Sequence, residues 1–217
     1  MQQIFDAILD PSIDATNPHE AAIWTLDEAN VSAYKIVGIS SVPGALGVYS
    51  YADPYKKAYL NFDGGESSFS IDADGTMKVH FGDEIDNFGQ QFGFFWETNG
   101  GTFYTEDEKN RGAAMSLSYL MSDGTNVDLT DDTLQDLKDA YASNDYTFLG
   151  GLNRVITAQG DNDWILGFED GTDGDFQDAV FYVEDMKPVP EPATMLLLGT
   201  GLLGIAAFGR KKLMKRS

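Results

Sequence analysis

Five carboxylates gather within ten residues near the C-terminal end of the sequence: Glu169, Asp170, Asp173, Asp175 and Asp178. Carboxylates this close repel one another unless water or a cation neutralises them. Oxygen ligands spaced D-x-D-x-x-D, beside glycines that let a loop fold back, suit Ca²⁺, which takes about six to eight oxygens. The spacing fits no EF-hand loop. The residues predict a calcium site, and the alternative is an acidic hairpin loop that keeps a sheet edge soluble.

The elements that must position this loop are strands. Two apolar segments, 164–169 and 179–184, flank it, and 23 glycines and an aromatic content of 12% accompany short alternating segments along the chain. Turn signals such as Asp74-Gly75 separate these segments, as in hairpins. The other predicted strands are 34–39, 46–51, 68–72, 77–81, 92–97, 102–105, 115–120 and 154–157.

Many short strands with regular turns favour an all-β fold, a β-sandwich or jelly roll. We expect one or two short helices beside it. Thr130 can cap a helix in which Leu134, Leu137 and Tyr141 share one face, with Asp131 in its first turn. The first thirty residues are ambiguous, with a short helix as one interpretation of residues 18–30.

The acidic segment also resembles the C-terminal hallmark of a domain-of-unknown-function family found in bacterial surface proteins. That hallmark runs G-F-E-D, a short Gly/Asp loop, then D-x-D-Y-N-D; residues 167–170 match its first half, and Asp173, Asp175 and Asp178 match its second. Phe176 and Gln177 replace the usual Tyr and Asn. The resemblance covers about residues 90–185 and implies an all-β domain that is often assumed to bind calcium.

The last thirty residues have three parts. Val189, Pro190, Glu191 and Pro192 form a stiff, extended element. Residues 193–209 follow without a charge, long enough as a helix to span about 26 Å, close to the hydrocarbon core of a bilayer. Arg210, Lys211 and Lys212 then begin a basic end, which places the C-terminus in the cytoplasm.

This tripartite tail resembles the PEP-CTERM sorting signal of Gram-negative bacteria. The resemblance implies that an exosortase-type membrane enzyme processes the tail and sends the protein to the cell surface or the extracellular polymer. The alternative is a permanent membrane anchor. Because residues 1–6 contain neither a basic nor an apolar signal region, we expect the true start of an exported chain to lie upstream.

Composition agrees with export. Residues 188–217 hold five of the 14 basic residues and one of the 35 acidic residues, Glu191. Residues 1–187 therefore carry 34 acids against nine bases. This charge makes nucleic acid and anionic lipid poor partners and favours divalent cations. The absence of cysteine excludes thiol catalysis, disulfides and thiolate metal sites.

Catalytic patterns are sparse. His19 and His80 are the only histidines, they accompany no nucleophile or zinc motif, and we expect His80 to face solvent. A carboxylate pair for glycan hydrolysis is the remaining enzymatic alternative, and we expect no enzyme.

Aromatic residues suggest a binding function instead. Alternation in 92–97 predicts Phe92, Phe94 and Trp96 on one face and Phe95 on the other. These rings are either sandwich core or, if exposed, a surface that stacks on sugars through Trp96. Tyr49, Tyr51, Tyr55 and Tyr59 form a second candidate surface.

The sequence therefore predicts two parts. Residues 1–187 form an extracytoplasmic β-sandwich, and residues 188–217 form a sorting signal whose transmembrane helix, 193–209, holds the precursor in the inner membrane until processing. The predicted function is that of a surface or extracellular-matrix protein with a structural Ca²⁺ site. The alternative is a carbohydrate-binding module that acts in exopolysaccharide or biofilm.

Overall fold

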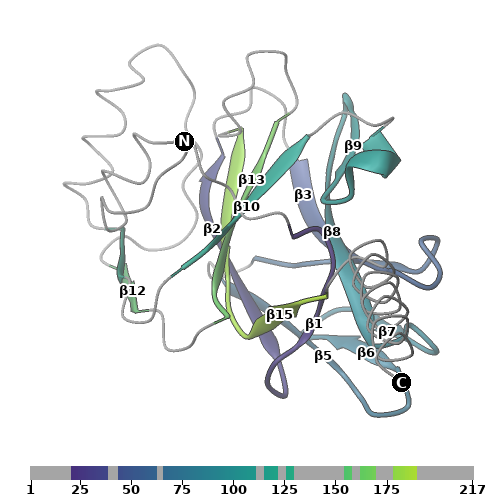
Figure 1. Ribbon diagram of the computed structural model, residues 1–217. Helices are drawn as coiled ribbons and strands as arrows, with labels where there is room; N and C mark the ends of the chain where they lie inside the picture. The colour runs from purple at the N-terminus through teal and green to yellow at the C-terminus, as the bar shows by residue number, and fades with distance from the viewer. Residues whose placement is uncertain are drawn as a thin grey trace, which may run out of the picture.

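The structure, a computed structural model, describes residues 21–38, 44–62, 66–110, 115–121, 126–129, 154–157, 162–169 and 178–189. These residues lie almost entirely in antiparallel strands and their turns (Figure 1). One single-turn 3₁₀ helix, η1 (Asp107–Asn110), is the helical element among them.

Sheet I has six strands in the order β15-β1-β8-β3-β4, with β9 also paired to β8. Its longest strand, β8, pairs with β3 along seven residues, from Gly44↔Thr98 to Ser50↔Phe92. The strands are β1 (Trp24–Leu26), β3 (Gly44–Ser50), β4 (Lys57–Tyr59), β8 (Gln91–Thr98), β9 (Gly101–Tyr104) and β15 (Met186–Pro188).

Sheet II has seven strands in the order β10-β13-β14-β2-β5-β6-β7. A third, two-stranded sheet pairs β11 (Asn126–Leu129) with β12 (Arg154–Thr157). The strands of sheet II are β2 (Val31–Gly38), β5 (Glu66–Ile71), β6 (Met77–Val79), β7 (Glu84–Ile85), β10 (Ser116–Leu120), β13 (Trp164–Phe168) and β14 (Ala179–Val183).

The core lies between the two large sheets, because alternating residues of both turn inward. Sheet I contributes Trp24, Phe92 and Phe94, and sheet II contributes Phe69 and Trp164; all five are buried in one cluster. The Trp24 ring stands edge-on to Phe94 and to Trp164, at centroid distances of 5.7 and 5.6 Å. This aromatic contact joins the sheets at the centre of the sandwich.

The expected all-β sandwich is confirmed, and all ten predicted strands occur, with ends shifted by one to three residues. Asp74-Gly75 turns the β5–β6 hairpin as expected, with Gly75 at φ 85° and the Thr76 amide donating to Asp74 Oδ1 at 3.0 Å. The interpretation of residues 18–30 as a helix is wrong for the described residues 21–30, because they contain β1.

The other two predicted helices, the one beginning near Thr130 and the transmembrane helix 193–209, fall outside the described residues. Within the described ranges, no helix has the length and apolar character needed to cross a membrane.

Candidate functional site

The acidic loop lies where the sequence predicts it, between β13 and β14. These strands pair antiparallel and end at Phe168↔Ala179, so Glu169 and Asp178 stand at the two ends of the loop. Glu169 is only 3% exposed, and its amide donates to the carbonyl of Met115 at 3.1 Å. The other three predicted ligands, Asp170, Asp173 and Asp175, lie outside the described residues.

No group of three or more metal-binding side chains occurs in the part of the chain that the structure describes, which holds only two of the five predicted ligands. The calcium site therefore stays a prediction. What the structure adds is the hairpin that brings both ends of the loop together.

Trp96 is not available for stacking on a sugar. Phe92, Phe94 and Trp96 point into the core, as the alternation predicts, and Trp96 is only 2% exposed. Its ring lies between Phe103 and Phe168, at centroid distances of 5.9 and 6.2 Å. The glycan contact proposed for Trp96 is wrong in this fold because both strand neighbours and the opposite sheet cover its indole.

Phe95 points to the opposite, outer face of sheet I, where it lies in an aromatic group with Tyr49. Both rings are fully buried because each lies over a glycine of the neighbouring strand: Tyr49 pairs with Gly93, and Phe95 pairs with Gly47. A Cβ at Gly93 would lie 2.3 Å from the Tyr49 hydroxyl oxygen. The glycines therefore create the space in which these rings pack against the sheet.

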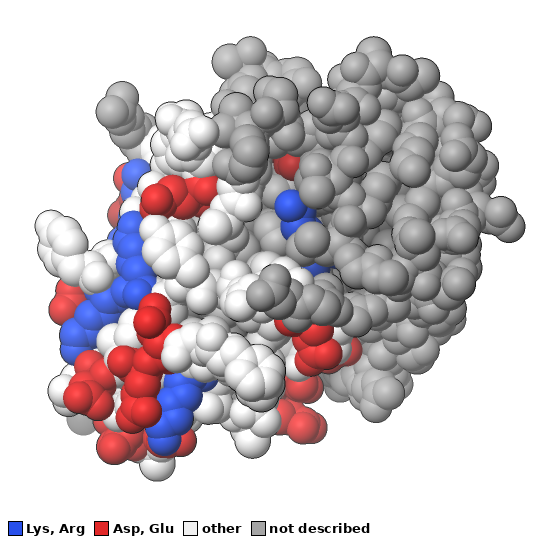
Figure 2. Space-filling view, turned by 180° about the vertical axis from the view of Figure 1, so that it is seen from behind, with Lys and Arg blue, Asp and Glu red and all other residues white. Residues whose placement is uncertain are grey.

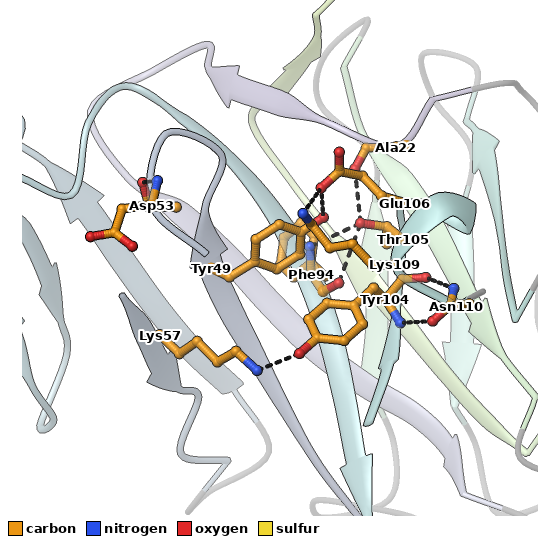
Figure 3. Close-up of polar contacts among 11 residues, drawn as sticks. Ala22, Tyr49, Asp53, Lys57, Phe94, Tyr104, Thr105, Glu106, Lys109 and Asn110 are labelled. Carbon is orange, nitrogen blue, oxygen red and sulfur yellow. Dashed lines mark hydrogen bonds and ion pairs between the residues drawn. The ribbon is translucent and has the colours of Figure 1, made fainter. Parts of the chain in front are cut away.

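Charged groups complete this outer-face cluster, which we define as Tyr49, Lys57, Phe95, Tyr104, Glu106 and Lys109. Figure 3 shows all of these residues except Phe95. The Tyr49 hydroxyl donates to Glu106 Oε2 at 2.6 Å, and Lys109 Nζ pairs with the same oxygen at 3.1 Å. Lys57 Nζ donates to the Tyr104 hydroxyl at 2.5 Å and lies 4.8 Å from the Phe95 ring centroid. Burial first, and the Glu106 hydrogen bond second, raise the pKa of Tyr49.

This cluster fixes the segment after β9 against the sheet. Thr105 Oγ1 donates to the carbonyl of Ala22 at 2.8 Å and accepts the amide of Phe94 at 3.1 Å. Asn110 at the end of η1 bonds both the amide and the carbonyl of Tyr104, at 2.8 and 2.6 Å (Figure 3). Because its donors and acceptors are paired with one another, the cluster stabilises the fold rather than offering a free binding face.

The other tyrosines of the second candidate surface are exposed to different degrees. Tyr55 in the β3–β4 turn is 96% exposed, and Tyr59 on the edge strand β4 is 47% exposed. Tyr59 stands edge-on to Phe95 at a centroid distance of 5.4 Å and so adjoins the outer-face cluster, in which Tyr49 is fully buried. The four tyrosines therefore do not form one exposed surface.

Another exposed aromatic residue borders a hollow on the outer face of sheet II. Phe81, just after β6, is 88% exposed and holds φ 56°. It lies beside His80, and the hollow next to it has a volume of about 250 Å³. We call this hollow the Phe81 groove; its lining side chains and backbone come from Asn30, Ser68, Phe69, Ser70, Lys78, Val79, His80 and Phe81.

Strand pairing explains why the floor of the groove is polar. Ser70 pairs with Lys78, and the His80 amide bonds the Ser68 carbonyl at 2.8 Å. These residues alternate with the buried Phe69 and Val79, so their side chains share the outer face. His80 is exposed, as predicted.

The groove could not be predicted from the sequence, because the predicted strand 77–81 extends through Phe81. The structure ends β6 at Val79, and the following turn places Phe81 outward. The available signal was the row of polar residues opposite Phe69 and Val79, followed by an aromatic before Gly82.

The last described residues belong to the sandwich. β15 pairs with β1 at the edge of sheet I, from Leu26↔Met186 to Trp24↔Pro188, and Val189 packs with Ile23, Tyr49 and Phe95. The described part of the chain is thus an antiparallel β-sandwich, and Val189 is its last described residue.

A family profile described as the PEP-CTERM protein-sorting motif matches residues 188–212. The chain therefore carries this sorting motif, which begins at the last residue of β15, and the motif marks an exported protein that exosortase sorts to the cell surface. The matched range includes residues 189–192 and 210–212, as the sequence predicts. No curated protein matches the chain.

Three bacterial lectins are among the solved structures that resemble the chain. They are the C-terminal domain of the BC2L-C lectin from Burkholderia cenocepacia, the Chromobacterium violaceum lectin CV2L in complex with alpha-methyl-fucoside, and a high-affinity mannose-binding lectin of Ralstonia solanacearum. Identities are 12, 11 and 10%; the matches cover 78% of this chain and 97, 98 and 97% of the lectins, with TM-scores of 0.31, 0.33 and 0.31. Similarities this loose carry no argument about a ligand of this chain.

Proposed function

We propose that this exported, exosortase-sorted protein serves in the extracellular matrix and binds neutral polysaccharide through the Phe81 groove. The observation that carries the proposal is Phe81 itself, a large apolar ring that is 88% exposed beside a polar hollow. A sugar ring needs one flat apolar surface for its C–H face and several hydrogen-bonding groups for its hydroxyls. The groove offers both. The proposal includes no catalysis.

The backbone of Phe81 supports a binding role. A bulky residue at φ 56° is uncommon, because its Cβ crowds the backbone in the left-handed region. Such conformations persist where the surrounding structure holds them, and they concentrate at ligand sites. Here the Gly82 amide bonds the Val79 carbonyl at 3.0 Å and closes the turn that carries the ring.

Charge favours a neutral glycan. The one lysine of the groove, Lys78, pairs with Asp72 at 2.7 Å, and this hydrogen bond raises the pKa of Lys78. Figure 2 shows lysines lying beside carboxylates across the described part of the opposite side of the molecule from Figure 1. With 34 acids against nine bases before residue 188, a polyanionic glycan meets net repulsion.

Two matched variants test the groove. Phe81→Asn removes the ring, and asparagine tolerates the left-handed backbone. We expect affinity for a neutral glucan or galactan to fall about tenfold, since one lost stacking contact costs about 1–2 kcal/mol. Tyr55→Asn removes an equally exposed ring elsewhere. Equal affinities for the two variants, measured by calorimetry, would show that the groove is not the binding site.

Calcium at the β13–β14 loop is a second proposal. It is favoured by the hairpin neck, where Glu169 is buried next to a loop that contains Asp170, Asp173 and Asp175, with Asp178 at the other end. A bound Ca²⁺ would neutralise the repulsion within the loop and stabilise the last two core strands of sheet II.

Thermal unfolding of the purified protein tests the calcium proposal. At a Ca²⁺ concentration a hundredfold above Kd, the expected gain is about 2.7 kcal/mol, a rise of about 5–10 °C relative to EDTA. Mg²⁺ is the control for general screening, and Asp175→Asn and Asp178→Asn are expected to abolish the calcium response. A shift that is the same in both metals, or that survives in both variants, means that the loop is a solvated turn.

The proposed sorting by exosortase includes a membrane-bound precursor. Residues 193–209 would hold the chain in the inner membrane, with Arg210, Lys211 and Lys212 on the cytoplasmic side, until exosortase processes the tail. Replacement of Pro190, Glu191 and Pro192 by alanine should leave the precursor in the inner-membrane fraction. Normal surface delivery of that variant would argue against sorting by this motif.

A further inference from the structure

The residues immediately before the Pro190-Glu191-Pro192 element are bound into the sandwich by their backbone. Met186, Lys187 and Pro188 pair with β1, and the Val189 amide donates to the Ile23 carbonyl at 2.9 Å. Pro188 lacks an amide hydrogen, and it is tolerated here because β15 is the edge strand of sheet I. Pro190 also lacks an amide hydrogen, so the Val189 amide is the last donor to sheet I among the described residues.

Further contacts hold three of these residues, Met186, Lys187 and Val189. Met186 is fully buried, its amide donates to the Asn162 carbonyl at 3.0 Å, and its own carbonyl accepts Trp164 Nε1 at 2.9 Å. Lys187 forms an ion pair with Asp27. Val189 packs against the fully buried Tyr49 and Phe95, so the outer-face cluster also receives the first residue of the sorting element.

From this geometry we propose that β15 is a strap that must separate from β1 before the sorting motif can be processed. An enzyme that cuts a peptide binds the chain in an extended form on both sides of the bond that it breaks, and accessible, locally unfolded segments are the ones that are cut. The residues at the N-terminal side of the motif are already paired with β1, bonded to Trp164 and packed against the outer-face cluster. Processing at this motif therefore requires a local opening of the edge of sheet I.

The strap makes processing depend on the stability of one edge of the domain. A weakly held β15 opens often and is processed quickly, whereas a firmly held one retains the precursor. This inference rests on the sorting motif and on residues 186–189, and it is independent of both the glycan and the calcium proposals.

A linker insertion in the full-length protein tests the strap. Six Gly/Ser residues placed between Val189 and Pro190 give the enzyme free chain without disturbing β15. In a host that makes the processing enzyme, we expect pulse–chase conversion of precursor to mature protein to accelerate at least threefold. The matched control carries the same insert between Asn99 and Gly100, in the exposed β8–β9 turn, and should convert at the wild-type rate.

A charge reversal provides a second measurement. Lys187→Glu places two carboxylates together at Asp27 and loosens the strap, so we expect faster conversion and faster hydrogen exchange at the Val189 amide. Asp72→Lys breaks a comparable surface ion pair with Lys78 on the other sheet and should change neither. Unchanged or slower conversion in both the linker variant and Lys187→Glu would overturn the proposal, since the enzyme would then accept or prefer the strand as it is folded.

Discussion

Replacing Gly93 by alanine tests whether the outer face of sheet I depends on its glycines. A Cβ at this position would lie 2.3 Å from the Tyr49 hydroxyl oxygen and 2.4 Å from its Cζ. Contacts this short cannot persist, so the phenol ring must leave its place over the strand. Tyr49 is fully buried and bonds Glu106 in its present position, so moving its ring breaks this hydrogen bond.

The expected loss follows from what the ring contacts. A hydrogen bond to a charged acceptor contributes about 1.5–3 kcal/mol. The edge contact of Tyr49 with Tyr104, at a centroid distance of 5.4 Å, contributes about 0.5–1.5 kcal/mol. We expect Gly93→Ala to lower the free energy of unfolding by about 3 kcal/mol and Tm by about 6–12 °C.

Urea unfolding followed by tryptophan fluorescence measures this loss, with Gly100→Ala as the control. A Cβ at Gly100 meets its nearest atom, Thr98 Oγ1, at 3.4 Å, so we expect a change within about 0.5 kcal/mol. Tyr49→Ala removes the ring that Gly93→Ala displaces, and the cost of the glycine substitution should vanish in that background. A cost that persists in the double variant would refute the assignment to the Tyr49 ring.

Three further predictions concern buried polar groups. Ser67→Ala should stabilise the fold by about 1 kcal/mol in urea unfolding, because Ser67 Oγ is buried without a hydrogen-bond partner in the described structure; a loss of stability would contradict this. Thr105→Val should cost about 2 kcal/mol, because it removes the bonds to Ala22 and Phe94, whereas Thr102→Val at a half-exposed site should be nearly neutral. Burial first, then the nearby Asp163, Asp185 and Glu66, raise the pKa of Glu184 from 4.5 to about 7, against an opposing hydrogen bond from Tyr182. The folded state therefore holds an extra proton between these pH values, so the stability from Glu184 is full below about pH 4.5 and is lost as pH rises to about 7. The full pKa shift corresponds to about 3 kcal/mol, which solvent screening reduces to about 1–2 kcal/mol. Glu184→Gln should remove this loss of unfolding free energy between about pH 4.5 and 7; an unchanged slope of stability against pH would show that Glu184 does not cause the loss.

Strands with regular alternation could be predicted from the sequence because their inward residues follow a period of two. The assignment of Phe92, Phe94 and Trp96 to one face and Phe95 to the other is confirmed for this reason. β1 could not be predicted, since three residues define no period. Its partners are β8 and the distant β15.

Candidate sites were harder to predict, because exposure depends on partners far along the chain. Trp96 has the composition of a sugar-binding residue, but Phe168 from the other sheet covers it. Phe81 has an ordinary sequence context, and only the end of β6 at Val79 turns it outward. The acidic loop could be located from the sequence because its carboxylates lie close together in the chain, and the pairing of β13 with β14 confirms the hairpin that carries it.

The pairing of β1 with β15 has a consequence for the order of events during export. This pairing joins the two ends of the described chain, and contacts between such distant segments form late. A chain that crosses a membrane from its N-terminus cannot close sheet I until residue 188 has emerged. The sorting tail is then the next segment to reach the membrane. The domain therefore completes its fold at the moment when its sorting signal arrives, and a chain that stalls earlier exposes the unpaired edge of β1 to proteases and to aggregation.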